Sequence, residues 1–215
     1  MNRLITFEGV EGSGKSTQLK LLGEYLLTQN IAHILTLEPA GTPIGRQIGD
    51  ILFNRKSSAM FPETELLLFF AARAQHTREV VIPALKADQW VLCDRFSDAT
   101  FAYQAAGRGL DESFVAGVND YSACRLKPGL TLLFDLRVET GLLRAGKRDI
   151  QLADPSAADR FEREKLDFHN RVRDKYLSLS RENPDRFRII DADRSVEDVS
   201  MDVRRHAMDY IIHNR

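Results

Sequence analysis

Residues 9–16 read Gly-Val-Glu-Gly-Ser-Gly-Lys-Ser, a glycine-rich loop of the form G-x-x-x-x-G-K-S. The apolar run Leu4–Phe7 precedes this loop, and leucines at helical spacing follow it. Between a strand and a helix, such a loop directs backbone N–H groups toward an anion, and the helix dipole adds to the attraction. The lysine of such loops reaches the β- and γ-phosphates, and the hydroxyl after it binds Mg²⁺. The stretch therefore predicts a nucleoside triphosphate site rather than an ordinary turn, with nucleotide contacts at Gly9, Val10, Glu11, Gly12, Ser13, Gly14, Lys15, Ser16 and Thr17.

The composition fits a single globular domain spanning residues 1–215. Apolar residues make up 43% of the chain, which is enough for a hydrophobic core. The net charge of −1 gives no general attraction to nucleic acid or to an anionic membrane. No apolar run approaches the roughly 18 residues that cross a bilayer, and no signal-peptide pattern opens the chain. We expect a cytoplasmic protein that binds neither nucleic acid nor membranes.

Five short apolar runs are separated by helical patterns, and each is typical of a buried strand. Their continuous rather than alternating apolar character indicates parallel strands that are covered on both faces. The prediction is a three-layer α/β fold in which polar residues after the strands face one cleft. The predicted strands are Leu4–Phe7, Ile34–Leu37, Trp90–Cys93, Leu130–Asp135 and Phe187–Asp191.

Asp94 and Arg95 follow directly after the third predicted strand. Beside a phosphate-binding loop, a strand-end aspartate such as Asp94 can hold Mg²⁺ through water, and the adjacent arginine can bind a second phosphate. The alternative is a structural ion pair. The chain has no Asn-Lys-x-Asp run, and no Asp-x-x-Gly follows a strand. The absence of these GTPase signatures favours a kinase that acts on a small acceptor over a molecular switch.

A polar segment over residues 144–163 interrupts the alternation of strands and helices. Basic residues bracket it, with Arg144, Lys147 and Arg148 on one side and Arg160 and Arg163 on the other. An arginine that closes over a transferring phosphoryl group stabilises its charge, and a mobile lid excludes water. The segment is interpreted either as such a lid or as a solvated loop.

At several longer motifs the chain resembles thymidylate kinases, and the resemblance runs over nearly its whole length. The loop and its flanks resemble the opening of that family, and residues 38–42, Glu-Pro-Ala-Gly-Thr, resemble its Glu-Pro-Gly-Gly-Thr turn. Residues 69–76 resemble its long helix. The most specific match is Asp94-Arg95-Phe96-Ser97-Asp98-Ala99-Thr100-Phe101-Ala102-Tyr103-Gln104, followed by Gly107-Arg108-Gly109.

The resemblance implies a P-loop fold like that of nucleoside monophosphate kinases, with a five-stranded parallel sheet and a mobile lid. It also implies a homodimer and Mg²⁺-dependent transfer of the γ-phosphoryl group of ATP to dTMP. By resemblance, Arg95 holds the dTMP phosphate, Arg73 hydrogen-bonds the thymine, and Phe69 stacks on the ring. Tyr103 lies under the sugar and favours deoxyribose. The implied dTMP contacts are Glu38, Phe69, Arg73, Arg95, Thr100, Tyr103 and Gln104, with Ser16 and, through water, Asp94 at the metal.

Some members of the family carry an arginine inside the phosphate loop, where this chain has Gly12. The resemblance therefore implies the type whose catalytic cation comes from a basic lid, and Arg148 and Arg160 are equal candidates. Glu11 resembles the acidic residue that meets the 3′-hydroxyl of the sugar. The implied catalytic residues are Lys15, Arg95, Glu11, Arg148 and Arg160.

Three positions depart from the family pattern. Leu37 and Gly49 stand where arginines are usual, and Ala40 replaces a glycine. Arg46 lies one helical turn before Gly49 and is a possible substitute for the arginine missing there. Two alternatives remain open: a kinase for another deoxynucleotide or a nucleoside, and a nucleotide-binding regulatory protein that has lost transfer.

Overall fold

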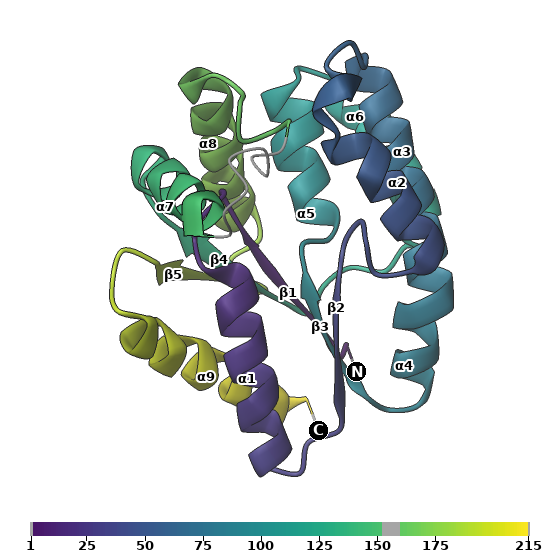
Figure 1. Cartoon of the computed structure of the whole chain (residues 1–215). Coiled ribbons are helices and arrows are strands. Elements are labelled where there is room, and N and C mark those ends of the chain that lie inside the picture. Colours follow the sequence, from purple (N-terminus) through teal and green to yellow (C-terminus); the bar gives the residue numbers. More distant parts are fainter. Residues whose placement is uncertain (1, 152–159, 215) are drawn as a thin grey trace.

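The centre of the molecule is a five-stranded sheet, all parallel, with the strand order β2-β3-β1-β4-β5 (Figure 1). The structure is a computed structural model that describes residues 2–151 and 160–214. The three central strands are buried almost throughout, which explains their continuous apolar sequence. The five predicted strands are confirmed as β1 (Leu4–Gly9), β2 (His33–Leu37), β3 (Trp90–Asp94), β4 (Leu130–Asp135) and β5 (Phe187–Asp191).

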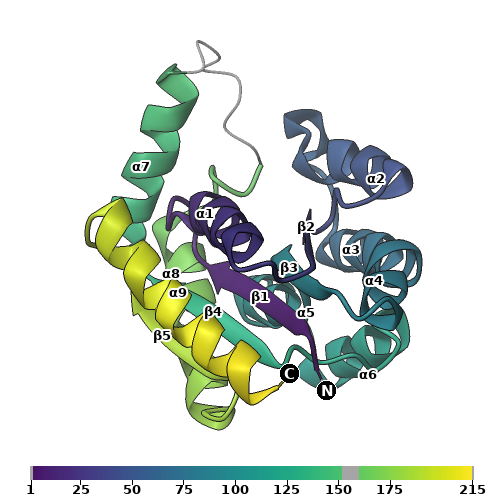
Figure 2. The same ribbon diagram turned by 90° about the horizontal axis from the view of Figure 1, so that it is seen from below.

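Helices cover both faces of this sheet, as predicted for a three-layer α/β fold (Figure 2). α1 and α9 pack together on one face, and α4, α5 and α8 contact the strands from the other. The α-helices of the described residues are α1 (Lys15–Thr28), α2 (Pro43–Phe53), α3 (Pro62–His76), α4 (Ile82–Lys86), α5 (Ser97–Thr100), α6 (Glu112–Ser122), α7 (Val138–Gln151), α8 (Leu166–Glu182) and α9 (Val196–His213). A short 3-10 helix (Arg55–Ser57) follows α2, and a π-helical segment (Phe101–Gly107) continues α5.

The helix ends follow local capping chemistry. Thr42 precedes α2 and its hydroxyl accepts from the backbone N–H of Gly45 over 2.9 Å, while proline occupies the first turn. Ser195 caps α9 in the same way, accepting from Asp198 N over 3.1 Å. From Pro62 the chain is helical as far as Lys86, because a π-helical turn (Thr77–Val81) joins α3 to α4.

The carboxyl ends of the strands bring the predicted polar segments to one edge of the sheet. β1 leads into the phosphate-binding loop, β2 into Glu38, and β3 into Asp94 and Arg95. The backbones of β2 and β3 meet there, since Glu38 N donates to the carbonyl of Asp94 over 3.0 Å. This edge is where ligands bind in open parallel sheets.

The predicted lid over residues 144–163 has two described parts. Residues 144–151 continue α7, and residues 160–163 form a turn before α8. Residues 152–159 lie outside the described residues. The first part of the segment is therefore helix, because the amphipathic pattern of α7 persists into it.

Candidate active site

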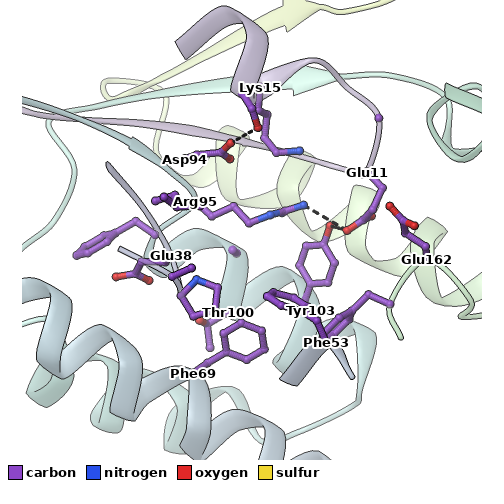
Figure 3. A pocket seen from close by; sticks show the side chains of 18 of the residues that line it. Glu11, Lys15, Glu38, Phe53, Phe69, Asp94, Arg95, Thr100, Tyr103 and Glu162 are labelled. Carbon is purple, nitrogen blue, oxygen red and sulfur yellow. Dashed lines mark hydrogen bonds and ion pairs between the residues drawn. The ribbon is translucent and has the colours of Figure 1, made fainter. Parts of the chain in front are cut away.

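A cavity of about 490 Å³ lies at the carboxyl edge of the sheet (Figure 3). Its size suits a nucleotide, and its wall combines a few charged groups with aromatic rings. All seven residues predicted to contact the acceptor line it, together with most of the phosphate-binding loop. Figure 3 shows the charged groups Lys15, Asp94 and Arg95 at one end and the rings of Phe53 and Phe69 at the other.

The phosphate-binding loop depends on glycines in conformations that other residues avoid. Gly9, Gly12 and Gly14 have φ values of +141°, +67° and +88°. A Cβ on Gly12 would lie 2.0 Å from the carbonyl oxygen of Gly141 in α7. No side chain fits at position 12 while α7 packs there, which gives a physical reason for the missing loop arginine.

Lys15 is buried beneath the loop and is held by it. Its Nζ donates to three loop oxygens, which are the carbonyls of Gly9 (3.1 Å) and Val10 (2.8 Å) and Ser13 Oγ (3.3 Å). Burial, helped by the charge of Arg95, lowers the pKa of Lys15 to about 8. These contacts aim the ammonium group into the loop, where a phosphate would supply a charged partner.

Ser16 and Asp94 provide oxygen ligands at the end of the loop. Ser16 Oγ donates to Asp94 Oδ2 over 2.5 Å. Oxygen donors suit Mg²⁺, which in nucleotide sites takes one or two protein ligands and keeps phosphate and water oxygens as the others. The described residues hold no cluster of three or more acidic, histidine or cysteine side chains placed to bind a metal. The pair thus fits a magnesium ion that arrives with a nucleotide.

Arg95 is fixed at the loop end of the cavity by its neighbours. Its backbone has φ +65°, an uncommon conformation that turns the chain at the end of β3. Its guanidinium donates to the carbonyl of Gly9 (3.1 Å), to the hydroxyl of Tyr176 (3.3 Å) and to Glu11 Oε1 (3.2 Å). It also lies 4.8 Å from the ring centre of Tyr103. Arg95 is therefore an anchored cation facing the loop, as an acceptor-phosphate residue needs to be.

Glu11 lies at the centre of a second set of contacts. Its Oε1 accepts from the hydroxyl of Tyr103 over 2.6 Å, and its Oε2 lies 3.4 Å from His169 Nδ1. Burial opposes ionisation, but His169 and Arg95 outweigh it and lower the pKa of Glu11 to about 2. Sequence reasoning missed His169, because a single buried histidine in α8 carries no spacing that marks it.

Arg73 is almost fully buried, and each of its three guanidinium nitrogens donates a hydrogen bond within the protein. It donates to Glu38 Oε2 (2.8 Å), to Asn119 Oδ1 (3.0 Å) and to the carbonyl of Phe96 (3.0 Å). His76 contacts the other oxygen of Glu38 over 3.1 Å. Burial raises the pKa of Glu38, but Arg73 and His76 outweigh it, so that the pKa is lowered. Arg73 and Glu38, predicted separately as acceptor contacts, thus form one ion pair in the wall of the cavity.

An aromatic wall closes the end of the cavity away from the loop. Phe69 lies 6.5 Å from Phe53 and 6.0 Å from Phe161 between ring centres, and Tyr103 lies 6.0 Å from Phe161. Phe69 and Tyr103 were predicted there, and Thr100 also lines the cavity as predicted. Phe53 and Phe161 were missed, because an isolated phenylalanine in a sequence is most often a core residue.

Comparison with known proteins identifies the family. The family model described as thymidylate kinase matches residues 7–203 of this chain. The chain belongs to the thymidylate kinase family. It is 50% identical to the thymidylate kinase of Syntrophus aciditrophicus, over 96% of this chain and 94% of that protein. It is 52% identical to that of Geotalea uraniireducens, over 92% of each. The crystal structure of thymidylate kinase from Ehrlichia chaffeensis matches with a TM-score of 0.73 and 31% identity, over 95% of this chain and 97% of that one.

The arginines predicted in the lid of this thymidylate kinase family member contact different parts of the protein. Arg160 is 9% exposed and donates to Glu65 Oε2 (2.6 Å) and to the carbonyl of Leu52 (3.1 Å). Arg144 lines the cavity and donates to the carbonyl of Ala192 over 2.9 Å. The side chain of Arg148 lies outside the described residues. The contacts place Arg160 near the aromatic wall and Arg144 near the loop.

The residues at the departures from the family pattern differ in whether they line the cavity. Leu37 and Ala40 line the cavity, whereas Arg46 is exposed and is not among the lining residues. A Cβ on Gly49 would lie 3.6 Å from Pro39 Cγ, an ordinary contact, so a side chain can begin there. That Arg46 takes over the role of the missing arginine stays a prediction.

Among the described residues, no helix has the length and apolar character to span a membrane.

Proposed function

We propose that this protein transfers the γ-phosphoryl group of ATP to dTMP, giving dTDP and ADP. The observation that carries the proposal is one cavity with the phosphate-binding loop and Arg95 at one end and an aromatic wall at the other. Two phosphate sites beside a planar-base site are what transfer between two nucleotides requires. The motifs that the chain shares with thymidylate kinases lie on this same cavity.

In this mechanism, a phosphate oxygen of dTMP attacks the γ-phosphorus while the bond to the bridging oxygen of ADP breaks. Most of the catalysis is positioning and charge stabilisation. Lys15 and the loop N–H groups hold the β- and γ-phosphates. Arg95 holds the acceptor phosphate in line. Mg²⁺, held by Ser16 and through water by Asp94, would neutralise charge on the donor phosphates when bound.

The acceptor lies along the opposite half of the cavity in this proposal. Phe69 stacks on the thymine, while Arg73, Thr100 and Gln104 provide polar contacts to the base. Tyr103 excludes a 2′-hydroxyl, and Glu11 accepts from the 3′-hydroxyl. Glu38 keeps Arg73 aligned through their ion pair.

The remaining cation comes from the lid in our proposal, since position 12 cannot carry a side chain. Arg160 and Arg148 are the candidates that we propose, and Arg160 would have to leave Glu65 to reach the phosphates. The whole chain, residues 1–215, acts as one kinase domain with the lid at about residues 144–163. We further propose that it works in the cytoplasm and as a homodimer.

Acceptor-dependent ADP production tests the proposed function. ATP and Mg²⁺ are supplied with dTMP, dUMP, the ribonucleotide of thymine, dCMP, dGMP or no acceptor. We expect fast turnover with dTMP, slower turnover with dUMP and little with the ribonucleotide. Faster turnover with another acceptor would support kinase activity but would show that the residues assigned to bind thymine are wrongly assigned. ATP binding without acceptor-dependent turnover would instead favour a regulatory nucleotide-binding protein.

A further inference from the structure

Glu65 is a fully buried carboxylate behind the wall of the cavity. It lies in the first turn of α3 and is not among the residues that line the cavity. Gln104, which does line the cavity, donates from Nε2 to Glu65 Oε1 over 2.9 Å. Gln104 as a whole is only 2% exposed.

Two guanidinium groups share the same carboxylate. Arg108 Nε lies 3.1 and 3.2 Å from the two oxygens of Glu65, and Arg160 Nη2 lies 2.6 Å from Oε2. Facing two cations, Glu65 is a carboxylate that accepts hydrogen bonds and donates none. The Gln104 amide must therefore turn its NH₂ end toward Glu65. Its carbonyl oxygen is then the end available to the cavity.

We infer that Glu65 is a positioning residue that orients the Gln104 amide and so selects the base of the acceptor. A carbonyl oxygen at the cavity can accept directly from a ring N–H. A thymine attached through N1 has one such N–H, at N3, whereas cytosine has an acceptor at that position. Two facing acceptors cost binding energy, so the arrangement favours thymine over cytosine. This inference rests on the proposed function, because it places a pyrimidine base beside Gln104.

The substitution Glu65→Gln tests the inference. The new amide would turn its oxygen to the arginines and its NH₂ to Gln104, whose own amide would then reverse and present a donor to the cavity. We expect the ratio of the Kd for dCMP to the Kd for dTMP to fall by about tenfold or more. The measurement is titration calorimetry of each nucleotide with the full chain. The kcat/KM ratio for the two acceptors should fall in the same direction.

Two further variants separate orientation from structural damage. Gln104→Met removes the amide at similar volume and should by itself lower the binding ratio, and adding Glu65→Gln to it should change the ratio by less than about twofold. Arg108→Lys disturbs another partner of Glu65 without touching the amide, and the ratio should stay within about twofold of the wild type. Circular dichroism and ATP binding check that each variant is folded.

The outcomes separate this inference from the proposed function. An unchanged ratio in folded Glu65→Gln, or in Gln104→Met if Glu65→Gln does not fold, overturns the inference. Equal binding of dTMP and dCMP by the wild type overturns it as well. A wild type that binds dTMP selectively without turning it over contradicts the proposed function, and the binding ratios still decide the role of Glu65.

Discussion

Arg95 is fixed in position by protein contacts alone. Its guanidinium is held by a loop carbonyl, a tyrosine hydroxyl and Glu11, while its backbone adopts φ +65°. A cation fixed in advance loses little conformational entropy when it binds a phosphate. These surroundings support the proposed role of Arg95 in aiming the acceptor, while Lys15 is proposed to hold the phosphates of ATP.

We predict that Arg95→Ala lowers kcat/KM for dTMP by about 10³-fold or more, while the Kd for ATP changes by less than about fivefold. In the proposed mechanism Arg95 holds the acceptor, and the loop keeps its own contacts to Lys15 in the variant. Steady-state kinetics and calorimetry with ATP measure the two effects. Arg173→Ala, which removes an arginine paired with Asp135, is the control. Lost ATP affinity with turnover spared would show that the assigned role is wrong.

Glu8 is a buried carboxyl directly before the loop. It accepts from the backbone N–H of Phe96 and from the hydroxyl of Tyr176, each over 2.7 Å. Burial and the charge of Asp98 raise its pKa to about 8, against the opposing effect of Arg95. Between pH 4.5 and 8 the folded state therefore holds a proton that the unfolded state has released. The stability from this group declines as pH rises through that window.

We predict that Glu8→Gln becomes more stable relative to the wild type as pH rises from 5 to 8. The neutral amide keeps an acceptor for Phe96 N–H and carries no charge to be buried. Urea unfolding at the two pH values gives the difference in unfolding free energy. Glu24→Gln, at an exposed site on α1, should show no such trend. A stability difference that stays constant with pH would contradict the assigned protonation of Glu8.

At the scale of elements, α7 packs directly against the phosphate-binding loop. Gly12 and Gly141 make this approach possible, since a Cβ on Gly141 would lie 2.3 Å from the carbonyl oxygen of Glu11. Backbone atoms cannot move aside as side chains do. The position of α7 is thus coupled to the shape of the loop.

We predict that Gly141→Ala lowers ATP affinity by about tenfold or more and lowers stability by about 1–3 kcal/mol, because the added methyl group pushes α7 from the loop. Gly146→Ala on the same helix is a matched control, since its Cβ would meet nothing within 4 Å. That change should raise stability by about 0.5–1 kcal/mol through helix propensity. Calorimetry and thermal unfolding test both. Equal ATP affinity in the two variants would contradict the coupling.

The strands and the loop could be predicted because their causes are local in sequence. Buried parallel strands need continuous apolar runs, and the glycines of the loop mark its backbone. The side chains behind the site could not be predicted in this way. Glu65 resembles an ordinary acid in the first turn of a helix, yet it meets Gln104 from 39 positions away. Phe161 and His169 likewise gain their roles only when α8 packs against the cavity.

Across the whole molecule, the loop between β1 and α1 lies across the cavity from the acceptor wall, whose residues come mainly from α3, α5 and the π-helical segment Phe101–Gly107. Leu66 and Phe70 of α3 lie in the core, in one cluster with Ala105 and Val115. The exposed apolar side chains of this region are instead Phe61, Leu67, Phe114 and Tyr121, on α3, α6 and the turn before α3.

We predict that the homodimer forms through α3 and α6, which pack beside each other. Leu67 and Phe114 are each 54% exposed, and burying such groups against a second copy removes apolar area from water. The double variant Leu67→Lys and Phe114→Lys should shift the protein from dimer to monomer in sedimentation velocity. Leu27→Lys, at a 68% exposed site on α1, should leave it a dimer. A dimer that survives the double variant places the interface elsewhere, and a monomeric wild type contradicts the dimer itself.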